Sequence, residues 1–278
     1  MYALRSPSCQ SQIAAVLNTT VQATLNLADL KRIRVPMPRS ATRHAIAEVL
    51  GALDDKIAAN EQVSHAVDRA CQALFAGLEQ LASAPLSSIA VVNDQVTKPD
   101  KGQLRYLDIS SVGVGRYGWP EVIAWADAPS RARRVVRPGD TVWSTVRPNR
   151  RSHALVLDDD PELVGSTGLA VITPAGAGPA FVYEATKTPA FTSYLEGVAE
   201  GSAYPAVRGD RFLEAPVPAA SLDERERFEK VAYPARARAH SAHAESRRLA
   251  TLRDTLLPHL MSGRITVREA EQQVEEVL

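Results

Sequence analysis

Arginine is concentrated in one short segment of this 278-residue chain. Seven arginines stand between positions 131 and 151, against a single acidic residue, Asp140. The segment ends in "DTVWSTVRPNRR", where a run of β-branched and aromatic residues meets a Pro-Asn turn. Arginine can clamp a phosphate or form two hydrogen bonds with the edge of guanine, and asparagine can pair in the same way with adenine. The segment is therefore a candidate nucleic-acid contact, with a solvated hairpin tip as the alternative.

Two further stretches could supply contacts to a groove or a phosphate. "VGVGRYGWP" is a glycine-rich loop, and "GSTG" could offer hydroxyls and backbone amides, although a plain turn explains "GSTG" equally well. "EGSAYPAVRGD" ranks last, because a turn that closes a domain explains Ser202, Tyr204 and Arg208. The predicted contact set is Ser144, Thr145, Arg147, Asn149, Arg150, Arg151, Arg116, Tyr117, Ser166 and Thr167.

Catalytic and metal-binding patterns are not evident in the sequence. It contains no GxSxG, no HExxH and no phosphate-binding loop, and "GVGRYG" is followed by no helix start. His240 and His243 stand three apart without a third ligand, and Asp158 to Asp160 read best as an acidic turn before Pro161. We therefore expect no catalytic residue, metal or cofactor in this chain.

Bulk composition points to no particular partner. The chain has 32 basic and 32 acidic residues, and 45% of its residues are hydrophobic, as in ordinary globular proteins. No apolar run approaches the roughly 18 residues of a membrane span, and the start lacks signal-peptide features, so a cytoplasmic protein without membrane contact is expected. Cys9 and Cys71 stand apart from each other and from histidines, which suggests neither a disulfide nor a zinc site.

Two long helices are predicted. From Thr42 to about Leu81 apolar residues alternate at spacings of four and three, which is the heptad pattern of paired helices. Asn60 falls on that seam, where a polar residue more often fixes register than performs chemistry. The residues expected to pair the helices are Ile46, Leu50, Leu53, Ile57, Asn60, Leu74, Leu249, Leu252 and Leu256.

The second helix should begin with the capping box "SLDE" at Ser221 and end near Gly263. Pro234 predicts either a kink or a later start of the long helix near residue 234, because proline removes a backbone hydrogen bond. A second capping box, "TVRE" from Thr266, should open a short terminal helix.

Residues 86 to about 215 have a different pattern. Short β-branched runs are separated by prolines and glycines, and "PAFTSYLEG" looks helical, which together predict a mixed domain and an α+β protein. The runs expected to form strands are "SIAVVND", "LRYLDIS", "RRVVRPGDTVWSTVRP", "HALVLDD" and "GLAVITP". This region carries fourteen Lys and Arg against fifteen Asp and Glu, so its basic charge is local rather than general.

The chain also repeats itself at an offset of 180 residues. "NLADLKRIRVPMP" at 26–38 matches "AVRGDRFLEAPVP" at 206–218, and each leads into a long helix. The chain thus ends one domain and starts a helix twice, but the first copy has only the tail of that domain.

Five ordered motifs resemble the specificity (S) subunits of type I restriction-modification systems. They are "VPMP" with "TRHAIAEVLGALDDKIAANEQ", "YLDISSVG", "PGDTVWSTVRPN", "GSAYPAV" with "PVP", and "LRDTLLPHLMSGRI". The resemblance spans nearly the whole chain. It implies mixed α/β target recognition domains, each followed by a long helix, with the two helices antiparallel. It predicts the tail of a truncated first recognition domain at 1–38, long helices at 39–83 and 219–264, a complete recognition domain at 84–218 and a short helix at 265–278.

The resemblance also implies a function. The chain would direct adenine methylation and restriction by binding double-stranded DNA, while a methyltransferase (modification) subunit and a restriction subunit bind S-adenosylmethionine, ATP and Mg. With one complete recognition domain it would be a half-sized or truncated S subunit, and a homodimer could restore two readers. The alternative is a coiled-coil assembly or regulatory fragment that reads no DNA.

Overall fold

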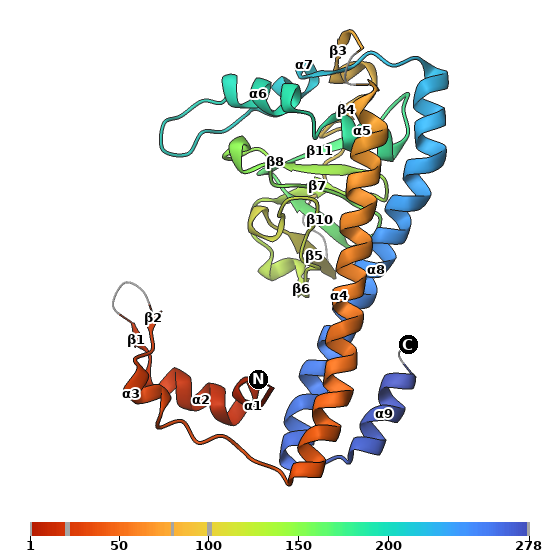
Figure 1. Cartoon of the computed structure of the whole chain (residues 1–278). Helices are drawn as coiled ribbons and strands as arrows, with labels where there is room; N and C mark the ends of the chain where they lie inside the picture. Colours follow the sequence, from red (N-terminus) through yellow and green to blue (C-terminus); the bar gives the residue numbers. More distant parts are fainter. Residues whose placement is uncertain (1, 20–22, 79–80, 99–101, 277–278) are drawn as a thin grey trace. The chain divides into compact units, whose positions relative to one another are not determined.

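The computed structural model describes residues 2–19, 23–78, 81–98, 102–276. They form two compact units, one of residues 1–65 and 241–278 and the other of residues 66–240. Two long helices, α4 (Ser40–Ala76) and α8 (Leu222–Ser262), each contribute to both units (Figure 1). With one mixed and one antiparallel four-stranded sheet between them in the sequence, the chain is an α+β protein, as predicted. None of the described helices is long and apolar enough to cross a membrane.

The helices α4 and α8 pack antiparallel. Along α4 the contacts on α8 run backwards: Asp54 contacts Arg253, Asn60 contacts Glu245, and Asp68 contacts Arg236. The capping box of Ser221 and Glu224 opens α8, which continues through Pro234, so a helix start near residue 234 is wrong. Burial of the apolar faces on both sides of the proline offsets its missing hydrogen bond.

The unit of residues 1–65 and 241–278 is largely helical. Ile46, Leu50 and Leu53 of α4 are buried against Leu249 and Leu256 of α8, with Ile57 and Leu252 packed beside them. The capping box of Thr266 and Glu269 opens the terminal helix, as predicted. The remaining elements are α1 (Tyr2–Arg5), α2 (Pro7–Val16), β1 (Asn18–Thr19), β2 (Ala23–Thr24), α3 (Leu27–Leu30) and α9 (Val267–Glu275).

The unit of residues 66–240 holds two four-stranded sheets. Their orders are β6-β5-β10-β7 and β4-β11-β8-β9, and the β10–β5 pair is the parallel one among the described pairs. The strands are β4 (Ala90–Val92), β5 (Gln103–Leu107), β6 (Val122–Ala124), β7 (Ala132–Val135), β8 (Thr141–Ser144), β9 (His153–Leu155), β10 (Leu163–Ser166) and β11 (Leu169–Pro174). The predicted β-branched runs all form strands, whereas β6 and β10 were not predicted.

Three helices and a small strand pair complete this unit. α5 (Pro179–Ala185) is almost fully buried, α6 (Pro189–Gly197) buries Phe191 and Leu195 as its periodicity predicted, and α7 (Gly209–Glu214) precedes α8. β12 (Pro216–Pro218) pairs with β3 (Ser83–Pro85), which joins the segment before α8 to the segment after α4. The matching prolines of the first repeat, Pro36 and Pro38, lie in no strand.

The predicted helix seam is wrong at one position. Leu74 is 51% exposed, and the next residue, Phe75, is buried instead against Phe181 and Phe228. A straight helix drifts relative to a strict seven-residue repeat, and here α4 packs on α5 as well as on α8. After Cys71 the next buried residue is therefore Phe75, four positions later, instead of Leu74, three positions later as the heptad pattern predicted.

Candidate nucleic-acid interface

Only the last part of the arginine-rich segment, residues 147–151, forms the end of the β8–β9 hairpin, in the unit of residues 66–240. Arg133 and Arg134 lie in β7, which belongs to the other four-stranded sheet. A single 3₁₀ turn at Pro148–Arg150 connects the two strands. The residues on either side, Arg147 and Arg151, both have φ of 52°, in the left-handed region that non-glycine residues seldom adopt. Backbone hydrogen bonds close the turn, from Arg150 to Arg147 and from Arg151 to Pro148, both 2.9 Å. This geometry leaves the side chains of Asn149 and Arg150 exposed.

The structure brings the other predicted stretches to the same hairpin end. The Thr145 amide and hydroxyl both donate to the Gly168 carbonyl at 2.9 Å, which joins "GSTG" to β8. The Arg147 amide donates to the Pro205 carbonyl at 2.7 Å, which brings in "GSAYPAV". Two segments from elsewhere in the sequence therefore meet the end of the hairpin.

The glycine-rich loop joins them through His153. The His153 amide donates to the Gly113 carbonyl at 2.9 Å, and the Gly115 amide donates to the His153 carbonyl at 2.8 Å. Gly115 has φ of 73°, a conformation that glycine adopts without strain. The loop leaves the Arg116 side chain exposed beside the hairpin.

Three of the predicted contact residues are buried and cannot present their side chains to a ligand. The Ser144 hydroxyl donates to the Val146 carbonyl at 2.9 Å, and the Ser166 hydroxyl oxygen accepts from the Gly168 amide at 3.2 Å. The Tyr117 side chain is only 5% exposed and its hydroxyl donates to Asp158. These predictions are wrong because β8 and β10 are buried at every position, which encloses Ser144 and Ser166, and because Tyr117 packs in a hydrophobic cluster. The residue types alone did not reveal this burial.

The remaining predicted residues keep accessible side chains. Thr145 and Arg147 are partly exposed, and Arg116, Asn149, Arg150, Arg151 and Thr167 are exposed. Neither Arg116 nor Arg150 forms a salt bridge with any residue that the structure describes. The hairpin end therefore offers several guanidinium groups, an amide and a hydroxyl together, which are donors that suit phosphates and base edges.

Tyr204, which the sequence analysis ranked last, is an exposed neighbour of Arg147 on this surface. Its side chain is 68% exposed, and the guanidinium carbon of Arg147 lies 4.4 Å from the ring centroid. A guanidinium stacked on an aromatic face loses conformational freedom but keeps its N–H donors at the edge. The sequence signal that could have found it is the repeat, because "GSAYPAV" directly precedes the repeated segment.

The acidic turn and α8 also have contacts that the sequence did not predict. Asp158 accepts from Tyr117 and lies 3.5 Å from Nε2 of His240 on α8, while Asp160 pairs with Arg105 at 2.8 Å. Asp158 therefore binds the glycine-rich loop through Tyr117, and Asp160 binds β5 through Arg105. Among the described residues no group of three or more His, Cys, Asp or Glu side chains is placed to hold a metal ion.

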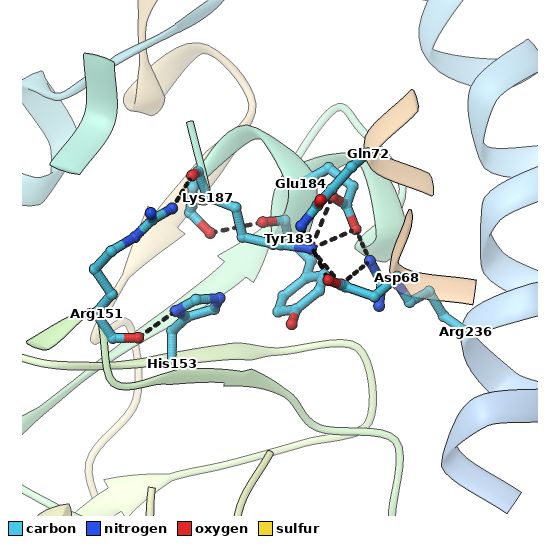
Figure 2. A network of polar contacts seen from close by, with 9 residues as sticks. Asp68, Gln72, Arg151, His153, Tyr183, Glu184, Lys187 and Arg236 are labelled. Atoms are coloured by element: carbon cyan, nitrogen blue, oxygen red, sulfur yellow. Dashed lines mark hydrogen bonds and ion pairs between the residues drawn. The ribbon is translucent and has the colours of Figure 1, made fainter. Parts of the chain in front are cut away.

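Behind the hairpin lies a buried network of charges (Figure 2). Glu184 of α5 and Asp68 of α4 both accept from Arg236 of α8 and from Lys187, whose Nζ lies 2.7 Å from Asp68 and 3.0 Å from Glu184. The Glu184 side chain is 2% exposed. Burial opposes the charge of Asp68, but the hydrogen bonds from Lys187 and Arg236 outweigh it and lower the pKa of Asp68. Burial likewise opposes the Arg236 cation, but the charge of Glu184 outweighs it and raises the Arg236 pKa.

His153 lies between this network and the hairpin. Its ring stacks on Trp143 at 4.9 Å and lies 5.6 Å from the ring of Tyr183. Nδ1 donates to the Arg151 carbonyl at 2.6 Å when the ring is neutral with its proton on that nitrogen. Burial lowers the pKa of His153 to about 4, so the ring is uncharged at neutral pH.

Comparison with known proteins gives the fold a class. The S subunit of the type I restriction-modification system from M. genitalium matches 93% of this chain and 71% of its own, at 19% identity and a TM-score of 0.56. This chain therefore has the fold of a type I S subunit. No family model and no curated protein matches the chain.

Two other solved structures show higher identity over a smaller part. The HsdS subunit from Thermoanaerobacter tengcongensis matches at 28% identity with a TM-score of 0.46, and a type I R-M system structure matches at 27% with a TM-score of 0.48. Each match covers 63% of this chain and 46% of the other. The chain thus spans about half the length of these two proteins.

Proposed function

We propose that the chain is a sequence-specific DNA-binding specificity subunit of a type I restriction-modification complex. The convergence of three other segments on the β8–β9 hairpin carries this proposal, because it gathers accessible Arg116, Arg147, Asn149 and Arg150 in a region that is otherwise near neutral. The S-subunit fold supports it. The unit of residues 66–240 then reads double-stranded DNA, with arginines on phosphates or guanine and Asn149 on adenine.

In this proposal the chain is non-catalytic. Adenine methylation and restriction belong to the methyltransferase and restriction subunits, and S-adenosylmethionine, ATP and Mg act there. We propose that the helices α4 and α8 dock the methyltransferase subunit. The accessible donors support binding rather than catalysis, since the histidines and carboxylates nearby serve structural contacts such as Asp158 with His240.

Selection from a random duplex library tests the proposal. The chain, with the methyltransferase subunit present, should enrich one sequence, and log affinity should fall linearly with log salt as phosphates release counterions. The enriched duplex should bind about 10³-fold or more tightly than random DNA at physiological salt. Equal affinity for selected and random duplexes would contradict the proposal. It would favour the alternative, a coiled-coil assembly or regulatory fragment that binds no specific DNA sequence.

A homodimer is part of the proposal. The described residues hold one pair of four-stranded sheets, all in the unit of residues 66–240, so one copy presents one reader. Two copies related by a two-fold axis would present two identical readers in opposite directions and would select an inverted repeat. Sedimentation equilibrium should give twice the 30.0 kDa chain mass, and the selected sequence should be palindromic. A monomer that selects a single asymmetric site would contradict the dimer.

A further inference from the structure

Arg151 is held differently from its neighbour Arg150. Its guanidinium Nη2 donates to the Lys187 carbonyl at 2.6 Å, and its own carbonyl accepts from the His153 ring at 2.6 Å. Its amide donates to the Pro148 carbonyl, which closes the turn. Arg150 has only the turn's backbone hydrogen bond, and no described residue binds its guanidinium. The two adjacent arginines therefore differ in what they hold, although the sequence suggests the same role for both.

Lys187 is itself held by two helices, and a third helix binds the same carboxylates. It follows α5, and its ammonium group binds Asp68 of α4 and Glu184 of α5, over the face of the Tyr183 ring at 4.8 Å. Arg236 of α8 binds the same two carboxylates. Figure 2 shows the chain of contacts from Arg236 through Asp68 and Lys187 to Arg151. The Lys187 carbonyl thus presents a fixed acceptor to the hairpin end.

The backbone of the turn needs such support. A non-glycine residue in the left-handed region is disfavoured, and it persists only where the surroundings determine it. At Arg151 the surroundings supply three hydrogen bonds, through the amide, the carbonyl and the guanidinium. Of the three, the guanidinium bond is the one that reaches outside the hairpin, to the turn after α5.

We propose that Arg151 is a positioning residue rather than a DNA contact. Its bond to Lys187 fixes the Pro148–Arg150 turn relative to α4, α5 and α8, so that Asn149 and Arg150 face the DNA in one orientation. This assigns Arg151 a role other than the predicted contact. The claim that the turn faces DNA rests on the proposed function. The claim that Arg151 fixes the turn concerns the free protein alone.

Hydrogen exchange of the free protein tests the positioning. In Arg151→Ala the amides of Arg150 and Arg151, which close the turn, should exchange about tenfold faster or more, because the outside anchor is lost. Arg150→Ala, the matched control, should leave the Arg151 amide unchanged. Arg151→Lys keeps a donor for the Lys187 carbonyl and should restore slow exchange, which separates positioning from general unfolding. Unchanged exchange in Arg151→Ala would overturn the proposal.

The salt dependence of DNA binding gives the second readout. Arg150→Ala should reduce the slope of log affinity against log salt by about 1, as loss of one phosphate contact does, or relax base preference at one position. Arg151→Ala should weaken binding of the selected duplex with the slope unchanged. A slope reduced by about 1 in Arg151→Ala would show a direct phosphate contact and overturn the proposal. If the wild-type chain selects no DNA sequence, the proposed function fails, while the exchange result still decides the positioning.

Discussion

Two clusters of tyrosine, aspartate and arginine join α4 to α8, one in each unit. In the unit of residues 1–65 and 241–278, Tyr2 donates to Asp54 at 2.6 Å and Arg253 donates to the same carboxylate at 2.6 Å. In the unit of residues 66–240, Arg236 binds Asp68 at 2.9 Å and lies 4.9 Å from the Tyr183 ring. The same three residue types thus link the helix pair twice.

The clusters differ in burial and in what they support. The two aspartates are about equally exposed, by 37% for Asp54 and 39% for Asp68, and the arginines by 16% for Arg253 and 9% for Arg236. The difference lies in the other members of the clusters. The second adds Glu184 and Lys187, exposed by 2% and 9%, and connects onward to the hairpin end. A pair near solvent contributes little to stability, whereas a buried network is costly to break because it leaves a charge without a partner. The same Asp–Arg pairing can therefore be a contact near the protein surface or part of a larger network that reaches the hairpin end.

Removal of Arg236 should produce the largest difference between the clusters. Arg236→Ala leaves Glu184 and Asp68 with Lys187 alone, and we expect the free energy of unfolding to fall by about 3–5 kcal/mol. Arg253→Ala, the matched control, should cost about 1 kcal/mol or less. Urea unfolding should be followed both by tryptophan fluorescence, which reports on the unit of residues 66–240 where all three tryptophans lie, and by helical circular dichroism, which reports on both units. Equal shifts in the two variants would contradict the comparison.

The apolar surroundings of the buried cluster should matter as much. Phe75 packs on Phe181 and Phe228 and is 1% exposed, so Phe75→Ala should cost about 3–5 kcal/mol. Leu74→Ala, one position earlier and half exposed, should change stability by less than about 0.5 kcal/mol. The same fluorescence titration measures both. If Leu74→Ala lowered the free energy of unfolding more than Phe75→Ala does, Leu74 would be the seam residue, as the heptad pattern predicted.

His153 should make the unit of residues 66–240 sensitive to acid. Burial holds the pKa of His153 at about 4, below its unfolded value of 6.5, so between these values the unfolded chain binds a proton that the folded chain does not. Stability should therefore fall as pH drops from 6.5 to 4, by up to about 3 kcal/mol from this residue. His153→Gln should flatten the fluorescence-detected profile in that window. A profile equally steep in both proteins between pH 6.5 and 4 would show that His153 does not cause the acid sensitivity.

The fold was largely predictable because it depends on local patterns. Apolar spacing located both helices, β-branched runs located strands such as β8 and β11, and the capping box located the start of α9. β10 was not predicted, because "ELVGS" has a short apolar run followed by a turn signal, and its place depends on pairing with β5 and β7. Non-local pairing leaves little trace in a short segment.

The candidate site was only partly predictable. Composition located the arginine-rich hairpin, but hydroxyl residues on both sides of a turn look alike in sequence, and Ser144 and Ser166 proved to be buried. The roles of Tyr204 and Lys187 depend on contacts with residues 57 and 36 positions away along the chain, Arg147 and Arg151. Such contacts follow from packing, which periodicity and composition do not encode.

Target methylation by a reconstituted complex tests the central claim most directly. The triple variant Arg147→Ala, Asn149→Ala and Arg150→Ala should assemble with the methyltransferase subunit but lose methylation of the selected sequence. Arg211→Ala removes an exposed arginine of α7 that pairs with Glu214, and it should methylate as the wild type does. Loss of methylation with intact assembly is the predicted result. Unchanged methylation in the triple variant would show that the hairpin end does not read DNA.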